Sequence, residues 1–163
     1  MNYETRKADR ADLEMIVRRF PAARPLLCIP EQAVQVAVST TGNFVGVIVG
    51  FYCSNLTMAA SGLDHEAVMA LAEPLSFEKI TNIHIPVIFV EASHRDTKAF
   101  PLLFDGFKRL LQSLVESGAR LGYVTAAPGN VEETTVFMAL GLEPYGDGTF
   151  LATDAQDFID IRA

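Results

Sequence analysis

Cysteine and histidine are scarce in this sequence, and their scarcity disfavours two kinds of site. The 163 residues include only two cysteines, Cys28 and Cys53, and they do not form a Cys-x-x-Cys pair. Two such thiols disfavour a disulfide-built extracellular scaffold, so we expect a reduced, cytoplasmic protein. The three histidines are His65, His84 and His94, and their spacing is not that of metal ligands. We therefore expect no metal site.

Basic residues are also few relative to acidic ones. Thirteen Lys and Arg stand against twenty Asp and Glu, which gives a net charge of −7, and the sequence contains no basic run. This balance disfavours a nucleic-acid partner. A cationic small molecule would suit the charge, although solubility explains it equally well.

Long apolar runs are absent. Residues 32–63 carry no formal charge, but Ser, Thr, Gly and Asn interrupt them, and the apolar part Phe44–Cys53 is too short to span a bilayer. The N-terminus carries Arg6, Lys7 and Arg10 early and has no apolar signal-peptide core. We expect neither a membrane partner nor export.

Several well-known catalytic motifs are missing as well. The sequence contains no Gly-x-Ser-x-Gly elbow, no Walker phosphate loop and no Gly-x-Gly-x-x-Gly turn. The usual signatures of α/β-hydrolases, P-loop nucleotide hydrolases and dinucleotide-binding enzymes are therefore not present.

The length and the 50% hydrophobic content predict one domain over residues 1–163. Residues 3–8 suit a first strand, and Asp9 is a candidate N-cap, with Asp12 three residues later, for a helix that Pro21 would end. Further along, the alternation of Val34, Val36 and Val38 with smaller or polar residues predicts a half-buried strand.

The middle of the chain predicts a hairpin followed by an insertion. Residues 40–43 suit the turn, and Phe44–Cys53 suits the antiparallel partner strand. Residues 54–85 then form a long connection, with a helix expected over 64–73 that Asp64 would cap. Such an insertion is often a lid, a specificity element or an oligomer contact. It could equally have no function.

The second half of the chain predicts a strand, helix, strand and helix in succession. Val87–Val90 follows Pro86 as a short β-branched and aromatic strand, and a helix begins near Pro101 and ends before Gly118. A strand over 122–127 and a helix over 130–140 follow. Two parallel strands joined by a helix make a right-handed crossover, and its loop suits a phosphate ligand.

The end of the chain predicts a closing hairpin and a last helix. Residues 143–145 and 149–153 are expected to pair through a turn at 146–148. Residues 154–163 place Phe158 and Ile161 at helical spacing, so this segment either docks on the core or frays.

Two segments of this second half resemble the GNAT acyltransferases. In the first segment the family motif runs valine, any residue, proline, two residues, arginine or glutamine, two residues, glycine, one residue, and glycine or alanine. In the same register this chain has Val90, Glu91, Ala92, Ser93, His94, Arg95, Asp96, Thr97, Lys98, Ala99 and Phe100. The second segment is similar to the rest of the family signature. It has Asn130, then Phe137 where the family usually has tyrosine, and then residues 140–144.

The resemblance implies a fold and an activity. The expected fold is a single α/β (α+β) domain, with a mixed, mostly antiparallel sheet flanked by helices around a central parallel pair. The implied activity is acyl-CoA-dependent N-acyl transfer, most simply from acetyl-CoA to an amine on a small molecule or protein, by a sequential mechanism. Family habit also makes a homodimer an expectation.

The resemblance also implies a set of site residues. Amides of residues 95–99 would hold the pyrophosphate, amides near residues 90–92 would orient the thioester carbonyl, and Glu91 would be the general base. The cofactor-binding residues implied in this way are Val90, Ala92, Arg95, Asp96, Thr97, Lys98, Ala99, Asn130 and Phe137.

Other interpretations of three of these residues remain open. Strand alternation could point Glu91 to solvent. Arg95 could pair with phosphate through its guanidinium or could be an exposed loop arginine balanced by Asp96. Asn130 could be a helix N-cap, a cofactor contact or both.

The sequence departs from the family pattern at positions that matter for catalysis. Lys98 and Phe100 occupy the glycine positions, where a Cβ crowds the approach to a pyrophosphate, and Pro101 removes an amide donor. Phe137 cannot transfer a proton, although a thiolate leaves more easily than an alkoxide. Tyrosines that could replace the missing acid are Tyr52, Tyr123 and Tyr145. The alternative function is therefore a catalytically inactive GNAT-like domain that binds a ligand or a protein.

Overall fold

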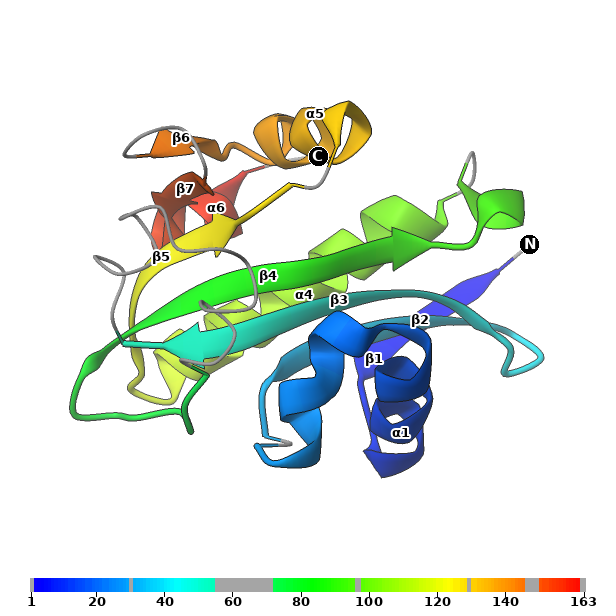
Figure 1. The fold of residues 1–163 in the computed structure, drawn as a ribbon, viewed down its shortest axis with the longest axis horizontal. Coiled ribbons are helices and arrows are strands. Elements are labelled where there is room, and N and C mark those ends of the chain that lie inside the picture. The colour runs from blue at the N-terminus through cyan, green and yellow to red at the C-terminus, as the bar shows by residue number, and fades with distance from the viewer. Residues whose placement is uncertain are drawn as a thin grey trace.

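The computed structural model describes residues 2–29, 31–54, 72–95, 98–128, 130–145 and 150–161. Within these ranges a seven-stranded sheet has the order β1-β2-β3-β4-β5-β7-β6 (Figure 1). The strands are β1 (Tyr3–Lys7), β2 (Ala33–Ser39), β3 (Phe44–Cys53), β4 (Ile80–Val90), β5 (Arg120–Ala126), β6 (Glu143–Tyr145) and β7 (Phe150–Asp154). The helices are α1 (Arg10–Arg19), α4 (Ala99–Glu116), α5 (Val131–Ala139) and α6 (Ala155–Asp160), with 3-10 turns η1 (Pro21–Leu27) and η2 (Ala92–His94).

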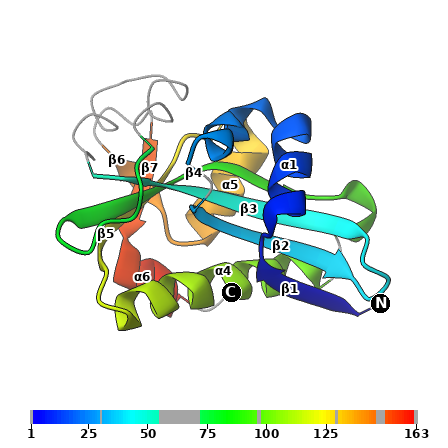
Figure 2. The same cartoon turned by 90° about the horizontal axis from the view of Figure 1, so that it is seen from below.

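The strand pairing confirms the mixed, mostly antiparallel sheet. Among the described strands β4 and β5 are the parallel pair, and the other neighbours run antiparallel. Helices cover both faces of the sheet: α4 and α6 lie along one face, and α1 and η1 lie on the other (Figure 2). No helix in the described ranges is long and apolar enough to cross a membrane.

The first helix forms as the sequence predicts. Asp9 accepts a hydrogen bond from the Asp12 amide at 2.9 Å, and the Asp12 carboxylate accepts one from the Asp9 amide at 2.8 Å. This capping box satisfies two amides that have no partner within the helix. Helix α1 ends at Arg19, just before Pro21, and Ile16 faces the core.

Strand β2 is more buried than the alternating pattern predicted. All seven of its residues are buried, because Ala33 and Ala37 pack under α4 while Val34 and Val36 pack under α1 and η1. The prediction of a half-buried strand was wrong because a helix covers each face. The next strand, β3, follows a turn at 40–43 as predicted.

Strand β4 begins earlier than the sequence predicted. Its eleven residues start at Ile80, so Pro86 lies inside the strand rather than before it. The connection that was expected to run to residue 85 therefore ends at residue 79. The helix expected over residues 64–73 lies largely outside the described residues, as does the turn at 146–148.

Helix α4 packs against β1, β2 and β3, and the C-terminal helix α6 packs beside it against β5 and β7. Pro101 lies in the first turn of α4, and Gly118, with φ of +104°, follows the end of the helix, as predicted. Phe158 of α6 is buried and contacts Phe104 and Phe107 edge to face, with ring centroids 5.3 and 6.2 Å apart. The C-terminal segment therefore docks on the core.

Candidate functional site

Strands β4 and β5 separate halfway along β4. They pair in parallel from Ile80 and Arg120 to Ile85 and Ala126, and the pairing stops there. The sequence predicted that residues 87–91 pair in parallel with residues 122–127. The parallel pair exists, but the earlier half of β4 forms it, so the predicted paired segment of β4 was wrong. Pro86 follows the last paired residue and has no amide hydrogen to donate to a ladder. Residues 87–90 pair with β3 alone among the described strands, and β5 diverges from them (Figure 1).

After Pro86, some backbone amide and carbonyl groups of β4 face the side from which β5 has diverged. The Glu91 amide donates to the Val45 carbonyl at 2.8 Å, so the polar backbone groups of Glu91 face β3. Backbone groups of successive strand residues point to opposite sides, so those of Val90 and Ile88 face the separation. The Val90 carbonyl there accepts a hydrogen bond from Arg95 Nε at 3.2 Å.

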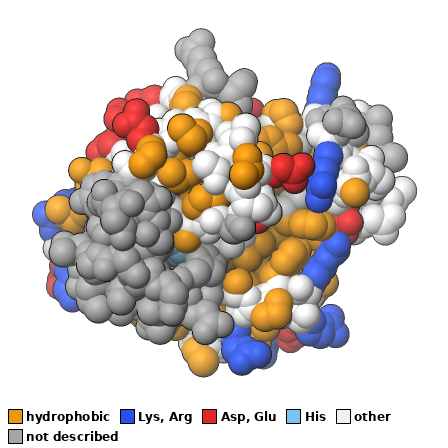
Figure 3. All heavy atoms as spheres, turned by 45° about the horizontal axis from the view of Figure 1, so that its top comes forward, with side chains coloured by type: hydrophobic (Ala, Val, Ile, Leu, Met, Phe, Trp, Pro, Cys, Tyr) orange, Lys and Arg blue, Asp and Glu red, His pale blue; other side chains and the backbone are white. Residues whose placement is uncertain are grey.

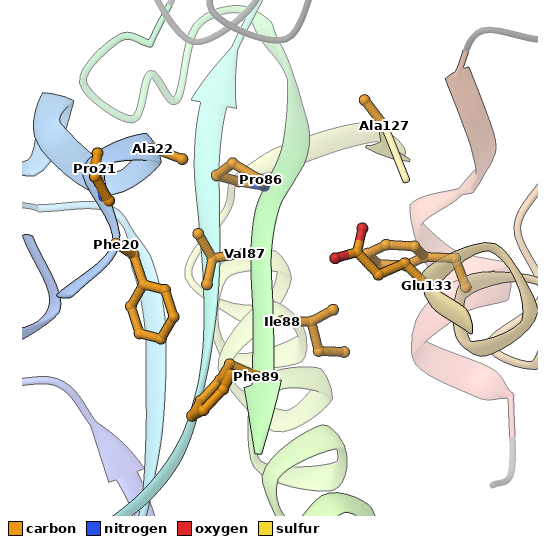
Figure 4. A pocket seen from close by; sticks show the side chains of 10 residues that line it. Phe20, Pro21, Ala22, Pro86, Val87, Ile88, Phe89, Ala127 and Glu133 are labelled. Atoms are coloured by element: carbon orange, nitrogen blue, oxygen red, sulfur yellow. The ribbon is translucent and has the colours of Figure 1, made fainter. Parts of the chain in front are cut away.

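A cavity of about 260 Å³ opens beside this half of β4 (Figure 4). Its walls come from four parts of the chain: residues 20–22 at the start of η1, residues 86–89 of β4, Ala127 after β5, and Glu133 and Phe137 of α5. The lining is apolar except for Glu133. Figure 3 shows hydrophobic side chains gathered on this face of the surface, with Lys and Arg side chains along one edge.

Glu133 is a site residue that the sequence analysis missed. It is half-buried in the first turn of α5 and points its carboxylate toward β4 (Figure 4). The Asn130 side chain accepts a hydrogen bond from the Glu133 amide at 2.8 Å, so the predicted N-cap holds the turn that carries Glu133. No sequence signal marked Glu133 beyond its place in that capping pattern, because its direction depends on how α5 packs against β4.

Glu91, the predicted general base, lies outside the cavity lining. Its carboxylate forms an ion pair with Arg19 at 2.5 Å, and the guanidinium of Arg19 stacks on Phe89, with 4.7 Å to the ring centroid. The hydrogen bond from Arg19 lowers the pKa of Glu91, and the charges of Arg19, His94 and Arg95 add to that effect. A carboxylate with a lowered pKa is a weaker base.

The loop between β4 and α4 carries most of the predicted cofactor contacts. Ala92 belongs to η2, Lys98 is the exposed N-cap residue of α4, and Ala99 is buried at the first position of the helix. Asp96 and Thr97 lie outside the described residues. The Arg95 side chain reaches back to Val90, and its amide donates to Ala92 at 3.5 Å.

The aromatic residues considered for proton transfer lie in different surroundings. Phe137 is 3% exposed and belongs to both the core and the cavity wall. Tyr52 is buried in β3 away from the cavity lining, and burial raises the pKa of its hydroxyl to about 12. Tyr123 is 40% exposed and faces a second hollow between β5, β7 and α6. The described lining of the 260 Å³ cavity contains no tyrosine.

The part of the chain that the structure describes holds no cluster of metal ligands. No group of three or more His, Cys, Asp or Glu side chains there could hold an ion. Neither Cys28, which is exposed, nor Cys53, which is buried, forms a disulfide.

Comparisons with known proteins support the fold. No protein-family model matches the chain, and no curated protein sequence matches it. Several solved structures match the chain. Arylalkylamine N-acetyltransferase 2 from Aedes aegypti matches with a TM-score of 0.63 at 9% identity, over 95% of this chain and 100% of that one.

Two further solved structures match over nearly their whole length. The loading GNATL domain of CurA from Lyngbya majuscula gives a TM-score of 0.62 at 13% identity, over 96% of this chain and 98% of that domain. AtaT, complexed with acetyl-methionyl-tRNAfMet, gives 0.59 at 12% identity, over 95% and 96%. This chain has the fold of the GNAT acetyltransferases, as the resemblance in its sequence predicted.

Proposed function

We propose that this protein is an acyl-CoA-dependent N-acyltransferase that transfers an acyl group, most simply acetyl, to an amine. The observation that carries the proposal is the separation of β4 from β5 after Ile85, with an apolar cavity at the same place. Structures with this fold include AtaTR bound with acetyl-CoA, so the fold accommodates that cosubstrate.

The residues present fit the acyl end of such a cosubstrate. Among the described strands, none pairs with residues 86–90 on the β5 side, and an extended amide-containing chain pairs with such an edge. The apolar cavity suits an acyl group, and the N-terminus of α4 follows the end of β4, where its dipole favours a phosphate. Acyl-CoA would supply an acyl group activated as a thioester.

The chain's own residues would then act at separate places. Backbone groups of Val90 and Ala92 would hold and orient the thioester end, while Arg95, Lys98 and the start of α4 would face the phosphates. Phe137 would exclude water from the reacting atoms. Asp96 and Thr97 are kept as proposed cofactor contacts from the sequence resemblance alone.

The nature of the acceptor is also a proposal. One structure with this fold, AtaT, is complexed with acetyl-methionyl-tRNAfMet, so the fold itself is compatible with a nucleic-acid complex. We nevertheless expect a small amine or a protein as acceptor here, because the chain carries thirteen basic and twenty acidic residues. A cytoplasmic location and a homodimer remain proposals.

A non-catalytic binding domain is the second candidate, and two contacts favour it. Arg95 already engages the Val90 carbonyl, and Glu91 is already paired with Arg19. Together with Lys98 at the N-cap of α4 and Phe100 in its first turn, these contacts favour a site with weakened cofactor binding.

Thermal unfolding with and without CoA or acetyl-CoA separates the two candidates. A ligand at a hundredfold its dissociation constant stabilises the native state by about 2.7 kcal/mol, which for this size of domain raises the Tm by roughly 5–10 °C. The acyltransferase proposal predicts such a shift. No shift at millimolar ligand would make the binding domain the working function.

A further inference from the structure

The Arg95 side chain bonds to the strand edge that the proposed cosubstrate would use. Its Nε donates a hydrogen bond to the Val90 carbonyl at 3.2 Å. That carbonyl faces the side from which β5 has diverged, because the amide of the next residue, Glu91, donates to the Val45 carbonyl of β3. Arg95 therefore covers the last backbone acceptor that β4 presents on this edge.

We propose that Arg95 determines specificity for acyl donors that carry phosphates. Its guanidinium has two alternative partners, the Val90 carbonyl in the ligand-free protein and a phosphate of acyl-CoA in the complex. Binding of the phosphates draws Arg95 away from β4 and uncovers the carbonyl for an amide of the donor's extended chain. This inference rests on the proposed acyltransferase function, and it adds a reason why the donor is a CoA thioester and not a thioester without phosphates.

The chemistry of the guanidinium favours this exchange of partners. A guanidinium matches the oxygens of a phosphate in a bidentate way, which adds a second hydrogen bond and the attraction of opposite charges. The Val90 carbonyl is a single neutral acceptor. Arg95 is exposed, and no ion pair joins it to another described residue, so a phosphate in solution can reach it.

The turn that carries Arg95 is anchored by other contacts. The His94 amide donates to the Glu91 carbonyl at 2.8 Å, and His94 Nδ1 shares a hydrogen bond of 2.8 Å with the Tyr3 hydroxyl. The Glu91 carboxylate pairs with Arg19 at 2.5 Å. These contacts tie η2 to β1 and α1 independently of the Arg95 side chain, so that side chain can change partner while the turn keeps its shape.

One side chain with two alternative partners couples the phosphate end of the donor to its thioester end. A ligand that needs the Val90 carbonyl but has no phosphate binds only the fraction of the protein in which Arg95 has moved away, and its apparent affinity falls by that fraction. One hydrogen bond from a charged donor sets the fraction at roughly one in ten. A donor with phosphates displaces Arg95 itself.

Isothermal calorimetry with the two parts of acetyl-CoA tests the inference. S-acetylpantetheine carries the thioester and amides without phosphates, and 3′-phospho-ADP carries the phosphates without a thioester. Arg95→Met keeps the aliphatic stem and removes the donor, so it should bind S-acetylpantetheine roughly tenfold more tightly than the wild type does. The same variant should bind acetyl-CoA more weakly, because the phosphate contact that it loses is stronger than the Val90 contact.

Cooperativity between the two parts gives a second measurement on the same proteins. In the wild type, saturating 3′-phospho-ADP should tighten S-acetylpantetheine binding by roughly the same tenfold factor, and in Arg95→Met it should have no effect. Arg109→Met is the matched control, because Arg109 is exposed on α4 and does not line the cavity. This variant loses the same charge and should keep the wild-type affinities for both ligands.

Two results would overturn the inference while acetyl-CoA binding by the wild type keeps the proposed function. They are an S-acetylpantetheine affinity that does not rise in Arg95→Met, and an affinity in the wild type that 3′-phospho-ADP leaves unchanged. If neither protein binds acetyl-CoA or its parts at millimolar concentration, the proposed function and the inference both fail. If Arg95→Met binds S-acetylpantetheine but the wild type does not bind acetyl-CoA, phosphates do not displace Arg95, which overturns both and leaves the non-catalytic candidate.

Discussion

The two halves of β4 share one strand but have different surroundings. Ile80–Ile85 pairs with β3 on one side and β5 on the other, and most of its side chains are buried. After Pro86, Val87–Val90 pairs with β3 alone among the described strands, and four residues of this half line the cavity. Backbone pairing on both sides builds the scaffold, and its loss on one side leaves groups that a ligand can use.

Side chains of the same type have different surroundings in the two halves of β4. Ile83 lies in the paired half with none of its surface exposed, whereas Ile88 lies in the separated half, is half-buried and lines the cavity. Burial in the first half contributes to folding, and partial exposure in the second contributes to binding. Substitutions in the two halves should therefore affect different measurements.

The largest expected effect is on stability, from Ile83→Ala. Removing a fully buried isoleucine costs about 2–5 kcal/mol, so the Tm should fall by roughly 5–15 °C. The matched variant Ile88→Ala should cost much less stability and should weaken acetyl-CoA binding instead, because Ile88 lines the cavity. Thermal unfolding and calorimetry on both variants check this, and equal stability losses would show that the separated half packs as tightly as the paired half.

Local patterns in the sequence predicted most of the elements. The Asp9 and Asp12 capping box, the turn at 40–43 and the glycines after α4 and α5 each depend on neighbours within a few residues. Gly118 and Gly141 have φ of +104° and +92°, values that favour glycine, and both follow a helix end as predicted. Such short-range signals are readable without knowledge of the fold.

The errors came from features that depend on distant parts of the chain. Pro86 looked like the residue before a strand because proline is rare inside sheets, but here it lies where the partner strand is lost. The double burial of β2 requires a helix on each face, which no local pattern reveals. Glu133 was missed for the same reason, since only the packing of α5 places its carboxylate at the cavity.

A smaller effect is expected from Asn130→Ala, which tests the link between the α5 cap and the cavity. Loss of the cap should cost about 1 kcal/mol and fray the turn at the cavity wall, so acetyl-CoA should bind more weakly. Asn130→Ser should restore both properties, because serine also caps helices.

The matched control for this cap lies at the other capped helix. Asp9→Ala removes the N-cap of α1 at a similar cost in stability, yet Asp9 does not contact the cavity. Its affinity for acetyl-CoA should therefore stay at the wild-type value. Equal losses of acetyl-CoA affinity in Asn130→Ala and Asp9→Ala would mean that general destabilisation, and not the α5 turn at the cavity wall, weakens binding.

The smallest effect is expected from Glu91→Gln, which tests whether this residue at the end of the separated half is structural. Folding lowers the pKa of Glu91 from its ordinary value of 4.5, chiefly through the Arg19 hydrogen bond. A carboxylate whose pKa falls on folding stabilises the protein above its ordinary pKa, and this contribution disappears as the pH falls through the lower folded value. The pair is partly exposed, so the difference should stay below about 1 kcal/mol.

Urea unfolding of wild type and Glu91→Gln between about pH 7 and pH 3 measures this difference. The wild type should be the more stable protein near pH 7, and its advantage should vanish toward pH 3 as Glu91 becomes protonated. In an Arg19→Gln background the same comparison should show little advantage at any pH, because the partner that lowers the pKa is gone. An advantage that persists at pH 3 would contradict an ionic origin. Unchanged stability at pH 7, together with a large loss of turnover, would return Glu91 to the role of general base.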